Sequence, residues 1–214
     1  MKKDLVEMVF ILDRSGSMGG LEKQTIAGFN ELLNKQKFVE GEAVISTILF
    51  DDQFEVLHHR EDIKTVNPLT DKEYFVRGST ALLDAIGRSI RKIVGVHKQL
   101  KDEYKPEKTI FIITTDGMEN SSTEFSYRDI RKAIEYQKEK YGWEFIFLGA
   151  NIDAVETAGR FGIHADRAAN YLADEMGTEL NYRVLDEAIS EFRVNKCVAP
   201  DWKEKIDKDY KKRS

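Results

Sequence analysis

The chain has 214 residues, of which 41% are hydrophobic and 33% charged, with 3 prolines. This balance is typical of one folded globular domain and excludes a disordered or fibrous chain. Its 33 basic and 38 acidic side chains give a net charge of −5, and no segment gathers Lys and Arg without interspersed Asp and Glu. We therefore expect no nucleic acid among its partners.

The first third of the chain is predicted to form a strand, a helix and a strand hairpin. Met8–Leu12 is a nearly continuous apolar run, which suits a strand covered on both faces. Apolar residues then recur at helical spacing over Ile26–Leu33. Ala43–Phe50 is a second apolar run, and Gln53–His59 follows it after only Asp51-Asp52. Because this link is too short for a parallel crossover, Gln53–His59 should pair antiparallel at an edge of the sheet.

The rest of the chain alternates helix and strand. Apolar runs predict strands at Thr109–Thr114 and Glu144–Leu148, and a short sixth strand is expected within residues 163–171. Helical spacing predicts four further helices, within Leu82–Val94, Ile130–Ile134, Val155–Phe161 and Leu180–Phe192. The alternation predicts an α/β fold: a doubly wound, Rossmann-like, mostly parallel six-stranded sheet with one antiparallel edge strand and helices on both faces.

Composition changes near the C-terminus, where lysines alternate with acidic residues from Pro200 onward. We expect residues 1–196 to form one domain and residues 197–214 a polar C-terminal tail, either solvated or a frayed helix. Trp202 is interpreted as a loose anchor of that tail.

The single cysteine, Cys197, excludes an internal disulfide and any multi-cysteine zinc or iron–sulfur site. It is interpreted as a packed or partly exposed thiol. The apolar run that ends at Asp13 is too short for a signal-peptide core or a membrane span. We therefore expect a cytoplasmic protein with no membrane partner.

Oxygen-bearing side chains stand where predicted strands end or helices begin. The first strand leads into Asp13-Arg14-Ser15-Gly16-Ser17, in which alternate residues of an extended turn can point the same way. Thr80 opens a helix, and Asp116 follows the strand that begins at Thr109. In doubly wound sheets, ligands bind beyond the carboxyl ends of the strands, where strand order reverses. If the strands ending at Asp13 and Asp116 are neighbours there, these side chains share one crevice.

Two carboxylates and three hydroxyls form an oxygen-only ligand set, which suits Mg²⁺ and disfavours zinc. Mn²⁺ and Ca²⁺ are the alternatives. The hydroxyls of Ser15, Ser17 and Thr80 are neutral, so a cation held by them, with Asp13 and Asp116 acting partly through water, keeps some of its charge. Such a cation would seek an external carboxylate.

Asp13-x-Ser15-x-Ser17, then Thr80, then Asp116 in Thr-Asp-Gly, resemble the metal-ion-dependent adhesion site (MIDAS) of von Willebrand factor A domains. The resemblance covers roughly the first 195 residues and includes the order of strands and helices. It implies a mostly parallel sheet with one antiparallel edge strand. It also implies that the three hydroxyls lie close to the metal, that the aspartates often act through water, and that an Asp or Glu of a protein partner completes the coordination.

Two further stretches refine the resemblance. Met18-Gly19-Gly20 stands where integrin-type relatives carry additional acidic residues, so a second adjacent metal is not implied. Gly149–Asp153, Phe161–Ile163 and Ala168–Tyr171 resemble compact stand-alone bacterial members of the family. The resemblance therefore points away from matrix adhesion.

Each candidate ligand also has a local structural explanation. Asp13 or Ser15 could cap the first helix, Thr80 could cap the next, and Asp116-Gly117 could be a simple turn. All five positions matching in order by chance is improbable, so we favour the metal site. Asp84 lies one turn beyond Thr80 and is interpreted as a solvated helix carboxylate rather than as a support for Thr80.

Histidines do not add to this site. His58 and His59 are adjacent in a predicted strand and so point to opposite faces, and His97 and His164 are isolated. We interpret all of them as surface or hydrogen-bonded residues rather than ligands. Trp143, at the start of a strand, is expected to pack in the core.

The sequence favours a cation-dependent protein-binding module without enzymatic activity. A metal-assisted phosphoesterase is an alternative, but no Gly-x-x-x-x-Gly-Lys-Ser/Thr loop or Gly-x-Ser-x-Gly elbow is present, and no second carboxylate stands beside Asp13. A scaffold subunit of an ATPase or stress-response assembly is the other alternative, and the residues do not distinguish it from the first hypothesis.

Overall fold

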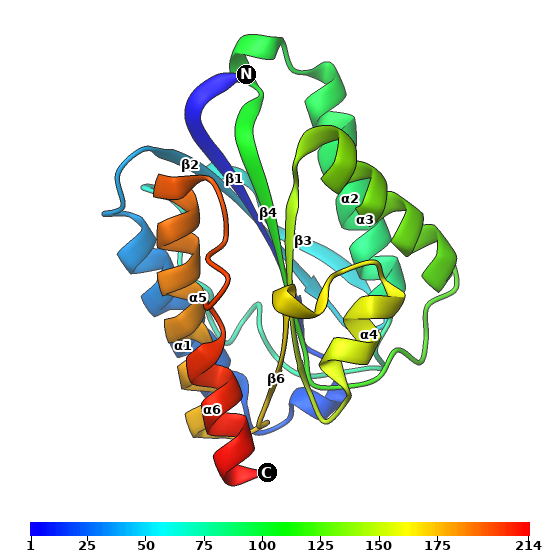
Figure 1. Cartoon of the computed structure of the whole chain (residues 1–214). Helices are drawn as coiled ribbons and strands as arrows, with labels where there is room; N and C mark the ends of the chain where they lie inside the picture. Colours follow the sequence, from blue (N-terminus) through cyan, green and yellow to red (C-terminus); the bar gives the residue numbers. More distant parts are fainter.

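A computed structural model describes all residues, 1–214. The chain forms a six-stranded sheet with the spatial order β3-β2-β1-β4-β5-β6 (Figure 1). Neighbouring strands run parallel except β2 and β3, which are antiparallel. The strands are β1 (Lys2–Asp13), β2 (Glu42–Phe50), β3 (Phe54–Asp62), β4 (Pro106–Thr115), β5 (Glu144–Ala150) and β6 (Ala168–Tyr171).

Helices cover both faces of the sheet (Figure 1). One face carries α1 (Glu22–Gln36), α5 (Glu175–Asn195) and α6 (Glu204–Arg213). The other carries α2 (Leu82–Gln99), α3 (Tyr127–Tyr141) and α4 (Ala154–Arg160). Short 3-10 helices lie at Gly16–Met18, Asp102–Tyr104 and Ala165–Arg167. The predicted fold class is confirmed, including the sixth strand and the antiparallel edge.

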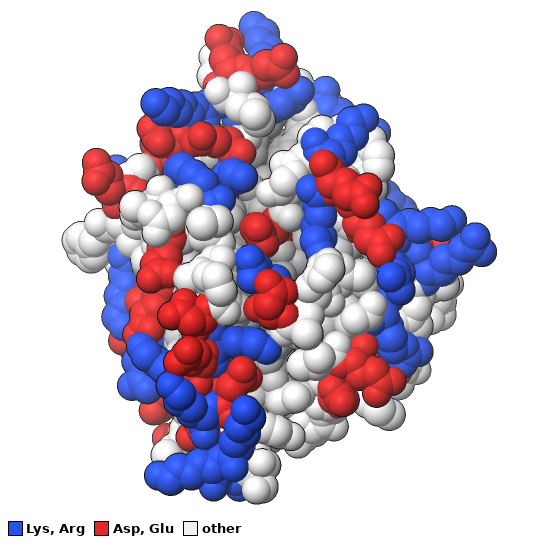
Figure 2. All heavy atoms as spheres, viewed as in Figure 1, with Lys and Arg blue, Asp and Glu red and all other residues white.

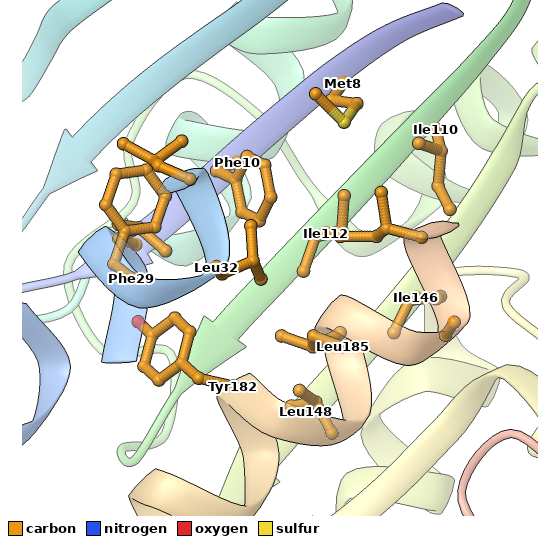
Figure 3. Packing of buried hydrophobic residues seen from close by; sticks show 14 of the residues in the cluster. Met8, Phe10, Phe29, Leu32, Ile110, Ile112, Ile146, Leu148, Tyr182 and Leu185 are labelled. Carbon is orange, nitrogen blue, oxygen red and sulfur yellow. The ribbon is translucent and has the colours of Figure 1, made fainter. Parts of the chain in front are cut away.

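The central strands are apolar along their length because each contributes side chains to two hydrophobic cores, one on each face of the sheet. In β1, Phe10 faces a core shared with α1 and α5, whereas the next residue, Ile11, faces a core shared with α2, α3 and α4. Both side chains are fully buried. A strand covered on both faces therefore has no polar alternation. Figure 3 shows the first core, where Phe10, Phe29 and Leu185 pack between β1, α1 and α5.

Strand order reverses between β1 and β4, which is the relationship expected from the sequence. The chain passes from β1 to β2, which pairs with one edge of β1, whereas β4 pairs with the other edge. In the β1–β4 pair, Leu12 lies opposite Thr114. Loops after these two strands therefore leave the sheet next to one another. This is the switch point at which doubly wound sheets bind ligands.

The C-terminal segment, expected as a solvated tail or a frayed helix, contains a helix that packs on the core. Residues 204–213 form α6, and Trp202 and Ile206 are buried in the core beside Val198. The indole N–H of Trp202 donates to the Asp166 carbonyl oxygen over 2.7 Å, so this residue is a fixed anchor rather than a loose one. The apolar residues recur every fourth position and make one buried stripe, while the abundant lysines occupy the outer side.

Charges on the surface are mixed in sign. Lys and Arg are interspersed with Asp and Glu over the face shown in Figure 2. Ion pairs account for part of this pattern, for example Lys205–Glu187 between α6 and α5, and Lys208–Glu204 within α6. None of the helices has the length and apolar character that a membrane span requires.

Histidines and aromatic residues follow the sequence interpretation. His58 is buried and its Nδ1 lies 2.9 Å from Thr47 Oγ1, whereas His59 is exposed. Trp143 is 4% exposed and stacks on Phe111 with ring centroids 5.2 Å apart. The expected core role of Trp143 is confirmed. Cys197 is exposed.

Candidate metal site

Three loops at one end of the sheet carry the five candidate ligands. Asp13 is the last residue of β1, and Ser15 and Ser17 lie in the turn built around the 3-10 helix Gly16–Met18. Asp116 directly follows β4. Thr80 stands two positions before α2, which begins at Leu82.

Side-chain oxygens of these residues form a continuous chain of contacts. Thr80 Oγ1 donates to Ser15 Oγ over 3.0 Å, and Ser15 Oγ lies 3.1 Å from Ser17 Oγ. Ser17 Oγ in turn donates to Asp116 Oδ1 over 2.6 Å. The backbone N–H of Ser15 donates to Asp13 Oδ1 over 2.7 Å. The structure therefore brings all five predicted residues together in one place.

Both carboxylates of the candidate site are buried, and Ser17 is the candidate ligand that is exposed to solvent. Asp13, Ser15, Thr80 and Asp116 are each at most 3% exposed, whereas Ser17 is exposed. Burial raises the pKa of Asp13 to about 6, and the negative charge of Asp116 adds to the rise. Burial also raises the pKa of the Asp116 carboxyl. Hydrogen bonds act in the opposite direction and lower both pKa values: Ser15 and Thr115 donate to Asp13, and Ser17 donates to Asp116.

A hard divalent cation fits this donor set. Asp116 Oδ2 is buried and has no hydrogen-bond partner, an arrangement that is rare for a carboxylate oxygen unless an ion or water satisfies it. At Gly117, an added Cβ would lie 2.9 Å from Ser17 Oγ and 3.3 Å from Thr80 Oγ1, so glycine keeps the space beside the hydroxyls free. All the converging side-chain donors are oxygens, which is the ligand type that hard divalent cations prefer.

No three His, Cys, Asp or Glu side chains gather anywhere in the chain in a way that could hold a metal ion. The candidate site is compatible with that observation because only two of its five donors are carboxylates. Its remaining three donors, Ser15, Ser17 and Thr80, are hydroxyls. A site of this kind is defined by its alcohol oxygens as much as by its acids.

Two residues outside the predicted set hold Asp13 in place. Thr115 Oγ1 donates to Asp13 Oδ2 over 2.6 Å, and the Tyr74 hydroxyl donates to the Asp13 carbonyl oxygen. Thr115 directly precedes Asp116 in the Thr-Asp-Gly motif, so the sequence did contain a signal that Thr115 lies at the site. Tyr74 lies in the loop between β3 and α2, and no local pattern connects it to the site.

A buried arginine ties the loop that carries Thr80 to the loop after β1. Arg14 has no exposed surface; its Nε donates to Asp51 Oδ2 over 3.1 Å and its Nη1 to the Glu73 carbonyl oxygen over 2.8 Å. Arg77 Nε donates to the same Asp51 oxygen over 2.6 Å. The backbone N–H of Gly16 also donates to the Gly78 carbonyl oxygen over 3.2 Å. These contacts fix Thr80 against the serine-bearing turn.

The interpretation of Asp84 as a solvated carboxylate is wrong. Asp84 is 6% exposed and accepts backbone hydrogen bonds of 3.0 Å from Thr123, Glu124 and Phe125. These donors belong to the loop between β4 and α3, which folds back over the first turn of α2. The error arises because the partners lie about forty positions away, beyond the reach of helical periodicity.

A scan against protein-family models gave no match, and neither did a comparison with curated protein sequences. Solved structures do show similarity. The chain superposes on proximal thread matrix protein 1 of the mussel byssus with a zinc-occupied MIDAS motif, with a TM-score of 0.58 and 12% identity, covering 86% of this chain and 46% of that one. A von Willebrand factor type A structure from Catenulispora acidiphila gives a TM-score of 0.53 and 15% identity, covering 86% and 42%.

The manganese-loaded TRAP protein of Plasmodium vivax gives a TM-score of 0.54 and 14% identity, covering 84% of this chain and 73% of that one. This chain spans less than half of the mussel and Catenulispora proteins. Identities at this level show a shared fold. The fold of this chain is therefore that of von Willebrand factor A domains.

Proposed function

We propose that this chain, with the fold of a von Willebrand factor A domain, is a divalent-cation-dependent protein-binding module. Its cation is Mg²⁺ in this proposal, and its partner supplies an Asp or Glu side chain. The observation that carries the proposal is the unbroken contact chain from Thr80 through Ser15 and Ser17 to Asp116. A chain of oxygens with one carboxylate oxygen left unpartnered is suited to sharing a single cation.

Each residue has a role in the proposed site. Ser15, Ser17 and Thr80 would offer neutral oxygens to the ion, and Asp13 and Asp116 would supply negative charge directly or through water. When bound, the cation would supply positive charge for a partner carboxylate. Because Ser17 is exposed while both aspartates are buried, a partner would approach on the Ser17 side.

Similar structures that carry a divalent metal support the proposal that this chain binds one. The mussel protein carries zinc in its MIDAS motif and the Plasmodium protein is loaded with manganese. Both superpose on this chain over more than four-fifths of its length. Oxygen donors without a thiol or imidazole favour Mg²⁺ or Mn²⁺ over zinc here.

We further propose binding rather than catalysis, and a cytoplasmic location. Of the four histidines, His58 contacts Thr47 and His97 contacts Glu7, and none hydrogen-bonds to a candidate ligand. The hydroxyls of Ser15 and Ser17 contact each other and Asp116, and no histidine hydrogen-bonds to either of them. A single exposed cysteine suits a reducing compartment.

The experiment compares partner capture in Mg²⁺ with capture in chelator, using immobilised wild-type protein and Asp116→Ala as baits. We expect proteins that are released by chelator and that the variant fails to hold. Capture that is insensitive to both treatments contradicts the proposal. Metal-dependent hydrolysis of a generic phosphoester, lost in Asp13→Ala, would instead favour the phosphoesterase.

A further inference from the structure

The loop that follows Asp116 is fastened to the start of α2 by hydrogen bonds that run in both directions. Ala81, which precedes the helix, makes no side-chain cap. Instead Glu119 Oε2 accepts from the Leu83 N–H over 2.9 Å, and Ser122 Oγ accepts from the Asp84 N–H over 3.0 Å. The loop thus satisfies backbone donors that a helix start leaves free. Asp84 returns the contact by accepting from backbone N–H groups of the same loop.

Within this loop, Asn120 contacts the candidate ligand Thr80 through two separate groups. Its side-chain Oδ1 accepts from the Thr80 N–H over 2.9 Å, and its own backbone N–H donates to the Thr80 carbonyl oxygen over 3.1 Å. Both polar backbone groups of Thr80 are therefore held by one residue. Thr80 is 3% exposed, whereas Asn120 lies at the surface.

Resting on the metal site proposed above, we propose that Asn120 is a positioning residue, which sets the place of the Thr80 hydroxyl relative to Asp116. Asn120 lies four positions after Asp116 on the same loop, so its bonds to Thr80 link two ligands that come from different parts of the chain. A threonine hydroxyl stands one bond from Cβ, and its location follows the backbone closely. Fixing the Thr80 backbone therefore limits Thr80 Oγ1 to a few staggered positions, one of which makes its contact with Ser15.

Removal of the Asn120 side chain should leave the fold intact. Glu119, Ser122 and Asp84 keep their own bonds between the loop and α2, and the Asn120 N–H keeps its bond to the Thr80 carbonyl oxygen. Only the acceptor for the Thr80 N–H is lost. Supporting residues of this type change metal affinity without contacting the ion.

The experiment measures Mn²⁺ binding by calorimetry for the wild type, Asn120→Ala and Thr123→Ala. Thr123 is an exposed residue of the same loop whose contact with Asp84 uses only its backbone N–H, so it is the matched control. We expect Asn120→Ala to bind Mn²⁺ about tenfold more weakly and Thr123→Ala to bind like the wild type.

Hydrogen exchange of the Thr80 amide in metal-free protein gives a second readout. We expect exchange at least about tenfold faster in Asn120→Ala. In Asn120→Asp it should stay slow, because a carboxylate oxygen can accept the same bond.

The outcomes separate the two proposals. A wild type that binds no Mn²⁺ overturns the metal site itself, and with it the role of Asn120. Wild-type binding with unchanged affinity in Asn120→Ala overturns only the positioning role. Weaker binding with unchanged Thr80 exchange, or an equal loss in Thr123→Ala, also overturns it, because the effect would then not pass through the Thr80 backbone.

Discussion

Ser17 Oγ donates to Asp116 Oδ1 over 2.6 Å although 99 positions separate the two residues. This bond joins the turn after β1 to the loop after β4 at the strand switch. The second oxygen of Asp116 is buried beside it without a partner. A carboxylate arranged in this way loses its hydration without full compensation. A bound cation would offset that loss.

Replacement of Asp116 by Asn should separate metal binding from stability. We expect Mn²⁺ affinity to fall at least about tenfold, because a charged ligand becomes a neutral amide. The free energy of unfolding of the metal-free protein should stay level or rise, since burial disfavours the Asp116 carboxylate. Calorimetric titration and urea unfolding measure the two quantities. Asp71→Asn, at an exposed position, is the control and should change neither.

The raised pKa of Asp13 predicts how stability depends on pH. Its folded pKa of about 6 lies above the unfolded value near 4, so the native state binds the proton more tightly. The free energy of unfolding of metal-free protein should therefore decrease as pH rises from about 4 through about 6, by up to about 3 kcal/mol from this group. Asp13→Asn should remove that part of the slope in urea unfolding. Equal slopes in wild type and variant would contradict the assignment.

Metal binding should show the opposite dependence on pH. Protons compete with the cation for Asp13, so Mn²⁺ affinity should fall as pH drops below about 6, by up to about tenfold per unit. Calorimetry at several pH values measures this, and pH-independent affinity would show that Asp13 is not deprotonated on binding.

An added methyl group at Gly117 should weaken the site from within. The new Cβ would lie 2.9 Å from Ser17 Oγ, so this hydroxyl would have to shift. We expect Gly117→Ala to lower Mn²⁺ affinity about tenfold or more, as measured by calorimetry. Gly95→Ala is the control, since nothing lies within 4 Å of its added Cβ. In mid-helix it should keep metal affinity and raise the free energy of unfolding by up to about 1 kcal/mol.

The buried Arg14 should matter more to stability than its neighbour Arg77. Arg14→Met leaves Asp51 buried with Arg77 as its remaining ion-pair partner, and we expect a loss of about 3 kcal/mol or more in urea unfolding. Arg77 pairs with the same carboxylate, but its side chain is 34% exposed. Arg77→Met should therefore cost clearly less, about 1 kcal/mol. Equal losses would mean that burial does not distinguish the two ion pairs.

Helix α6 should contribute to the stability of the whole fold. Ile206 is 1% exposed in the core, so Ile206→Ala should lower the free energy of unfolding by about 2–5 kcal/mol. Lys211→Ala, on the exposed side of the same helix, should change it by less than about 0.5 kcal/mol. Thermal unfolding checks both, and an unchanged stability in Ile206→Ala would instead favour the expected solvated tail or frayed helix.

Local patterns in the amino-acid sequence were enough to predict the six strands, the first five α-helices and the end of the sheet at which the site lies. Apolar runs such as Met8–Leu12 suit strands covered on both faces, and the helical stripes between them suit the covering of those faces. Asp13 follows one such run directly and Asp116 follows another after Thr115, so parallel strands place both residues at the same edge of the sheet. These inferences needed only local periodicity and the positions where it stops.

Which polar side chains meet could be seen only in the folded chain. Asp84, Asn120 and Tyr74 act on partners about forty or more positions away, and no repeat in the sequence marks such pairs. The same holds for α6. Its few apolar residues are outnumbered by charged ones, so the sequence does not show that Ile206 packs against β6 and α5. The physical reason is that burial and hydrogen-bond partnership belong to the packed chain. A polar residue in a sequence does not reveal whether water or a distant backbone group will satisfy it.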